Sequence, residues 1–104
     1  MPDDERYRVI GKLVIDHEQS KRDLTALETK AKNMAPTFRA ILGALAGYGD
    51  WTAEGTKFTY TETGHAQING TVPSLDDAVA LLGQIAAIKV LTRDLEQQRK
   101  KLGV

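Results

Sequence analysis

The sequence predicts a mainly α protein, an antiparallel hairpin of two long, coiled-coil-like helices with a small β-hairpin or ordered loop between them. Apolar residues recur in sevens in both halves of the chain, the spacing that a helix–helix seam requires. A segment rich in Thr, Phe and Tyr separates the two repeats and favours β-structure. The length of 104 residues suits one domain. We expect a single helical domain over residues 1–104, with helices at about 4–48 and 75–102 and the β-hairpin or loop at 50–73.

The first predicted helix carries two interleaved sevenfold repeats that together give the 3–4 spacing of a coiled-coil seam. Only two of their members are polar, His17 and Ser20, and these fall in neighbouring layers. We expect them to form one polar layer that sets the pairing register. The two repeats are Ile10, His17, Leu24, Ala31, Phe38, Leu45 and Leu13, Ser20, Leu27, Met34, Ile41, Tyr48.

Pro36 leaves two alternatives for this helix. A proline inside a helix removes one hydrogen bond and clashes with the carbonyl of the preceding turn. The helix is either kinked but continuous, because the heptad register passes through Pro36 without a skip, or broken near residues 33–36. In both cases the glycines Gly43, Gly47 and Gly49 weaken it, and we expect it to end at about residue 48.

The second predicted helix has clear signals at both ends. Ser74 is placed to cap its start, with Asp77 three positions later. Gly103 follows the basic residues 99–101, which suit the negative end of a helix. Between Ala78 and Leu91 apolar residues surround nearly the whole helix, so we expect this segment to be buried on more than one side.

Residues 57–61 alternate in the manner of a β-strand, and Glu62-Thr63-Gly64 predicts a three-residue loop with a left-handed Gly64. That loop would place Thr61 opposite His65 and Phe58 opposite Ile68. The faces then separate by chemistry: Phe58, Tyr60, Ala66 and Ile68 on one, Thr59, Thr61, His65 and Gln67 on the other.

Composition excludes several function classes. Fourteen basic residues balance fourteen acidic ones, so the chain lacks the cationic surplus of a non-specific nucleic-acid binder. It has no cysteine for thiol catalysis or thiolate metal sites, and its two histidines lack zinc spacing. We therefore expect no catalytic residue, metal or cofactor, and not an enzyme. No basic leader or bilayer-length apolar run is visible, which predicts a cytoplasmic protein without membrane contact.

A candidate ligand site lies around Trp51–Lys57. The stretch Gly47–Lys57 superficially resembles a phosphate loop, but the order Gly-Thr-Lys and the glycine spacing do not match. In a looser arrangement, aromatic rings would stack on a nucleotide-like anion while Lys57 and hydroxyl groups hold its polar atoms. Alternatively, Trp51 and Phe58 pack the hairpin onto the helix ends. The candidate ligand-binding residues are Tyr48, Trp51, Thr56, Lys57 and Tyr60.

The helix lengths predict a homo-oligomer. If the helices pair so that Leu24 meets Arg99, the start of the first helix extends beyond its partner with an uncovered apolar stripe. The all-round apolar part of the second helix adds another uncovered surface. The candidate interface residues are Tyr7, Ile10, Leu13 and Val14 on the first helix and Val79, Leu82 and Ala86 on the second.

Two functions follow from these patterns. The first is a non-enzymatic, homo-oligomeric helical interaction protein that binds a protein partner as an adaptor, chaperone-like or inhibitory component. The alternative is an oligomeric small-ligand module that binds a nucleotide-like anion near Trp51–Lys57. A purified sample with excess absorbance near 260 nm would favour the alternative.

Overall fold

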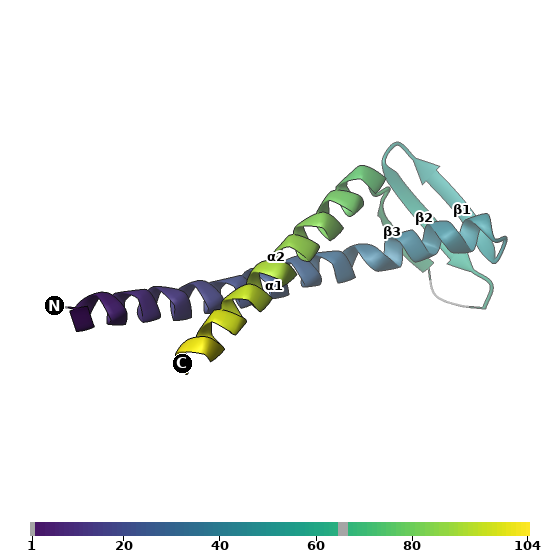
Figure 1. The fold of residues 1–104 in the computed structure, drawn as a ribbon. Coiled ribbons are helices and arrows are strands. Elements are labelled where there is room, and N and C mark those ends of the chain that lie inside the picture. Colours follow the sequence, from purple (N-terminus) through teal and green to yellow (C-terminus); the bar gives the residue numbers. More distant parts are fainter. Residues whose placement is uncertain (1, 65–66) are drawn as a thin grey trace. The chain divides into compact units, whose positions relative to one another are not determined.

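The structure is a computed structural model that describes the backbone of residues 2–64 and 67–104 and the side chains of residues 4–64 and 67–104. It confirms the predicted class: two long helices with a small antiparallel sheet between them in sequence (Figure 1). The chain divides into two compact units, unit 1 with Met1–Thr29 and Leu81–Val104, and unit 2 with residues 30–80. The elements are α1 (Pro2–Leu45), β1 (Gly49–Glu54), β2 (Lys57–Glu62), β3 (Gln67–Thr71) and α2 (Leu75–Leu102).

Helix α1 is one continuous helix with Pro36 inside it, so the alternative of a break near residues 33–36 is wrong. It ends at Leu45, three residues before the predicted end, because Gly47 adopts a left-handed conformation with φ +80°. The N–H of Tyr48 donates to the Gly43 carbonyl at 2.9 Å, and the N–H of Gly47 donates to the Ala44 carbonyl at 3.1 Å. This pair of bonds is the Schellman motif, which satisfies carbonyls at the helix end.

Helix α2 begins and ends with the predicted capping residues. The Asp77 N–H donates to the Ser74 hydroxyl oxygen at 3.2 Å, which confirms Ser74 as the N-cap. At the other end Gly103 is left-handed, with φ +71°, and the Val104 N–H donates to the Arg99 carbonyl at 3.0 Å. The helix therefore closes with the same Schellman-type pattern as α1.

The sheet has three strands in the order β1-β2-β3, one more than the predicted hairpin. The added strand, β1, joins β2 through the two-residue turn Gly55-Thr56, which lies between the paired residues Glu54 and Lys57. Gly55 has φ +61°, and no described residue other than glycine has a positive φ. A positive φ at the first turn residue only is the type II′ turn, whose twist matches that of the flanking strands.

The predicted β2–β3 register is wrong by two residues. Phe58 lies opposite Gly70, and Ile68 lies opposite Tyr60, whereas the sequence had placed Phe58 opposite Ile68. β2 ends at Glu62 and β3 begins at Gln67, so the connection is longer than the three-residue loop that we expected. Gly64 does have the predicted left-handed φ of +80°. The predicted positions of His65 and Ala66 lie outside the described residues.

The core of unit 2 joins the last turns of α1 to one face of the sheet (Figure 1). Ala40, Phe58 and Tyr60 are at most 3% exposed. Small residues let the helix approach closely: a Cβ added at Gly43 would lie 2.9 Å from the Tyr60 ring carbon Cζ. A register slip of two residues keeps each side chain on its face, so Phe58, Tyr60 and Ile68 still share the inner face as predicted.

Unit 1 pairs the N-terminal part of α1 with the C-terminal part of α2 in antiparallel fashion. The seam positions Leu13 on α1 and Leu81 and Ile85 on α2 are buried, and so are the polar His17 and Ser20. The heptad positions of both helices therefore meet inside one chain, as the spacing predicts.

Candidate functional site

The seam of unit 1 contains a polar layer whose members bond across the two helices. Arg99 Nη1 on α2 lies 3.0 Å from His17 Nδ1 on α1. Thr92 donates to the Ser20 hydroxyl oxygen at 3.0 Å, and Ser20 donates to the His17 carbonyl at 2.7 Å. A guanidinium can only donate, so His17 Nδ1 is the acceptor in this contact. The polar side chains are thus satisfied within the seam.

These contacts correct the predicted pairing of the helices. Arg99 meets His17 and not Leu24, a displacement of seven residues along α1, and Thr92 meets Ser20 where the predicted pairing has residue 31, a displacement of eleven. The two displacements differ, so the observed pairing is not the predicted one moved by a single heptad. As a result α2 reaches further along α1 than expected, and Leu13 is only 7% exposed within the single chain. Leu13 is therefore part of the seam and does not belong to an uncovered overhang.

The other predicted interface residues remain at least partly accessible. Ile10 and Val14 are half-buried, and Ala86 is exposed. Tyr7, Leu82 and Val79 are 71%, 61% and 60% exposed.

The five predicted ligand-binding residues do not come together at one surface. Tyr60 is 2% exposed and lies in the core of unit 2. Its burial raises the pKa of its hydroxyl, and the nearby Glu62 carboxylate raises it further. Trp51 shares the inner face with Tyr60, whereas Lys57 precedes Phe58 and points to the opposite face. Thr56 and Tyr48 are exposed in the two turns that flank β1.

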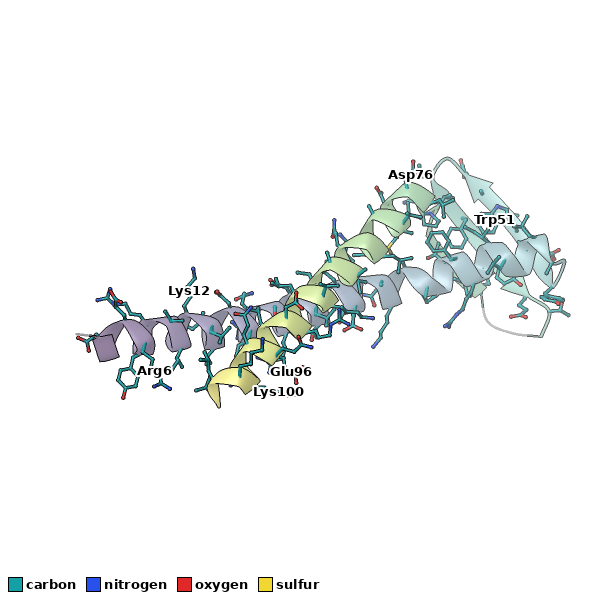
Figure 2. The ribbon with its side chains drawn as sticks, viewed as in Figure 1. Arg6, Lys12, Trp51, Asp76, Glu96 and Lys100 are labelled. Atoms are coloured by element: carbon teal, nitrogen blue, oxygen red, sulfur yellow. The ribbon has the colours of Figure 1, made fainter. Side chains whose placement is uncertain are left out.

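Trp51 instead anchors the sheet to the helix. It lies in β1, in the sheet of unit 2 (Figure 2), and its ring stacks on Phe58 with centroids 4.6 Å apart and planes 3° from parallel. It packs against the buried cluster of Ala40, Phe58 and Tyr60. This is the packing arrangement that the sequence offered as the alternative to a ligand site.

An apolar groove lies beside Trp51 at the end of α1. It has a volume of about 250 Å³ and is lined by Ile41, Ala44, Leu45 and Trp51. Leu45 projects beside it with 81% of its surface exposed, and Leu42 and Tyr48 nearby are each 65% exposed. Leu45 occupies a predicted seam position, but in the structure it lines this groove. The signal for it is the run Ala40–Gly49, which contains no charged residue.

A second groove, in unit 1, is wider and carries polar residues at its rim. It has a volume of about 460 Å³ and runs between the two helices of that unit. Ala26, Leu27, Ala87 and Ile88 form its apolar part, and Asp23 and Gln84 border it. Within the described side chains there is no group of three or more His, Cys, Asp or Glu residues that could hold a metal ion.

Glu18 contacts Arg99 of the polar layer from the surface of the seam. Its ionisation makes the stability of the fold depend on pH. Its carboxylate accepts from Lys21 at 3.0 Å and from Arg99 at 3.3 Å. The Lys21 hydrogen bond, followed by the Lys21 charge and the Arg99 contact, lowers the pKa of Glu18 against an opposing effect of desolvation. A lowered folded-state pKa stabilises the fold above the ordinary pKa of glutamate, about 4.3, and this contribution is lost as the pH falls through the folded-state value.

We therefore expect Glu18→Gln to lower the melting temperature at pH 7, and we expect this difference to shrink as the pH falls below the ordinary pKa of glutamate and Glu18 takes up a proton. Thermal denaturation of both proteins over a series of pH values from 7 downwards measures the difference. The difference at pH 7 should shrink in 1 M salt, because Glu18 is half exposed and its ion pairs are screened. A difference that stays constant over the whole pH series would contradict an electrostatic role for Glu18.

No described helix combines the length and hydropathy needed to cross a bilayer. Comparison with protein families, with curated proteins and with solved structures gives no match to the chain.

Proposed function

We propose that the protein is a non-enzymatic, homo-oligomeric helical interaction protein of the cytoplasm, which acts as an adaptor, chaperone-like or inhibitory component by binding a protein partner. The observation that supports this proposal is that exposed large hydrophobic residues outnumber the buried hydrophobic residues. Among the described side chains, six hydrophobic residues are buried and fourteen large hydrophobic residues are exposed. Each large aliphatic side chain left in water forgoes about 1.5–3 kcal/mol.

The exposed residues are also grouped and not scattered. In unit 1, Leu82 and Val90 lie within about 80° of each other around α2 and outside the buried positions Leu81 and Ile85. In unit 2, Leu42, Leu45 and Tyr48 gather at the end of α1. Grouped apolar residues on a protein surface mark interaction sites. Two such surfaces leave room for one self-contact and one contact with another protein.

The test is the mass of the purified protein in solution. Light scattering at micromolar concentration should give twice the chain mass of 11.4 kDa or more. The melting temperature should rise with protein concentration, because association stabilises the folded chain by mass action. A well-folded monomer whose melting temperature does not depend on concentration would contradict the proposal. Excess absorbance near 260 nm in the same sample would instead favour a nucleotide-binding module.

A further inference from the structure

The polar layer of unit 1 contains a titratable side chain whose charge state decides a contact between the two helices. His17 on α1 is 6% exposed, and its Nδ1 accepts a hydrogen bond from Arg99 Nη1 on α2 at 3.0 Å. An imidazolium carries a proton on both ring nitrogens and can accept from neither of them. The hydrogen bond from Arg99 therefore forms only while His17 is neutral.

Protonation of His17 would add a cation to a cluster in which cations already outnumber anions. The Glu18 carboxylate accepts from Lys21 at 3.0 Å and from Arg99 at 3.3 Å, so one negative charge already serves two positive ones. Like charges in contact repel, and burial disfavours the charged form of a histidine. The remaining charged neighbours do not offset a third cation: Asp16 is exposed, and Glu96 pairs with Lys100 at 3.9 Å.

Arg99 holds the end of α2 to α1. It lies in the last turn of α2 and contacts both His17 and Glu18 across the seam. The hydrogen bond from Thr92 to Ser20 lies about two turns earlier along α2. Loss of the Arg99 contacts therefore frees the part of α2 that follows Thr92. It also opens the seam beside Leu13, which lies one turn before His17 and is 7% exposed.

We propose that His17 and Arg99 form a pH-sensitive latch, which closes the seam of unit 1 at neutral pH and releases the last turns of α2 when His17 takes up a proton. Histidine in an unfolded chain takes up its proton at about pH 6.5. Stability falls with falling pH wherever the unfolded chain binds more protons than the folded chain. The latch therefore weakens from pH 7.5 to pH 5.5, above the range in which Glu18, with its lowered pKa, is protonated. This inference goes beyond the interaction function and does not require an oligomer.

Thermal denaturation of the full chain at pH 7.5 and pH 5.5 tests the latch. The melting temperature of the wild type should fall by about 5 °C between these two values. His17→Asn keeps an acceptor oxygen near the position of Nδ1 and cannot take up a proton, so its melting temperature should fall by less than half as much. The matched control is His65→Asn, which replaces the only other histidine of the chain and should keep the full decrease.

Arg99→Gln separates repulsion between the two side chains from the burial of His17. Glutamine is neutral and can still donate a hydrogen bond to Nδ1, so the decrease in melting temperature should again be less than half that of the wild type. A decrease of full size in Arg99→Gln would overturn the latch, because the pH dependence would then not come from the pair.

Spin labels measure the opening of the seam without a change at His17 or Arg99. The chain has no cysteine, so Ile15→Cys and Gln98→Cys attach one label to each helix of unit 1, both at exposed positions. Excess unlabelled chain restricts the signal to distances within one molecule. The distance between the labels should lengthen and broaden at pH 5.5, and it should stay unchanged when His17→Asn is added.

The outcomes are independent of the proposed interaction function, whose test is the mass of the protein in solution. A wild-type melting temperature that is equal or higher at pH 5.5 would overturn the latch, and so would a full decrease in His17→Asn. A decrease that disappears in His65→Asn would assign the pH dependence to the other histidine and overturn the latch as well. A label distance that does not change with pH would show that the seam stays closed.

Discussion

Replacing Phe58 by alanine is expected to destabilise the protein by about 3–5 kcal/mol, the usual range for a buried aromatic residue. Phe58 is 3% exposed and packs in one cluster with Ala40 and Tyr60. It also supports Trp51, whose ring lies 4.6 Å away centre to centre. Its removal leaves a cavity on the inner face of the sheet and frees the tryptophan. Because small domains are stable by only about 5–15 kcal/mol, a loss of this size takes much of the margin.

Urea denaturation followed by Trp51 fluorescence and by circular dichroism measures this effect. Val72→Ala is a suitable control, since Val72 is 41% exposed and should lose less than about 1 kcal/mol. If Phe58→Ala cost no more than this control, the cluster would not be the core of unit 2.

The second large effect is expected from Gly49→Ala, which should destabilise the folded protein by about 3 kcal/mol. Gly49 opens β1 and lies opposite Glu62 in β2. A Cβ at Gly49 would lie 2.8 Å from Glu62 Cα and 2.9 Å from the Thr61 carbonyl carbon, and it would also contact the Thr61 carbonyl oxygen. These are backbone atoms of the central strand, so they cannot move aside as a flexible side chain can. The start of β1 must therefore separate from β2.

Gly11→Ala is expected to have the opposite effect on the stability of the same chain. Gly11 lies inside α1 with no neighbouring atom within 4 Å of an added Cβ, so alanine should stabilise the helix by about 0.5–1 kcal/mol. The two substitutions have the same chemistry, and their urea midpoints should move in opposite directions. A midpoint for Gly49→Ala at or above that of the wild type would show that β1 does not approach β2 so closely.

The helices were predictable because their signals are local. Ser74, Gly47 and Gly103 act within a few residues of the ends that they define. The pairing register was not predictable from the same pattern, because apolar residues at heptad spacing can meet a second helix in more than one register. The choice depends on the contact of Arg99 with His17, and that pairing becomes apparent only when the side chains are placed in space.

The predicted hairpin over residues 50–73 pairs residues 57–61 with the segment after Gly64 and does not include the strand β1. The available signal was Gly55-Thr56, a two-residue turn with glycine first, following the alternating sequence of residues 50–54. The β2–β3 register failed for a different reason. Slips of two residues keep the same faces, so hydrophobic alternation constrains only the parity of the pairing.

The candidate site was only partly accessible to sequence reasoning. Strand alternation separates Trp51 from Lys57 and buries Tyr60, so these predicted ligand residues do not share one surface. Leu45 occupies a heptad position and was therefore assigned to the seam. In the structure α1 turns Ala40 toward the sheet, and Leu45 remains 81% exposed. No periodicity reveals which part of a long helix will meet a sheet.

The meander of three strands in unit 2 has a consequence for the order of folding. Its pairings are local: β1 meets β2 across two residues, and an isolated hairpin of this kind forms in about 1–10 μs. The seam of unit 1, in contrast, joins residues 72 to 82 positions apart, such as Ser20 with Thr92 and His17 with Arg99. The entropic cost of closing a loop grows with its length. Strand pairing in unit 2 shortens the flexible chain between these partners, so we expect the sheet to form first and the helical seam to close afterwards.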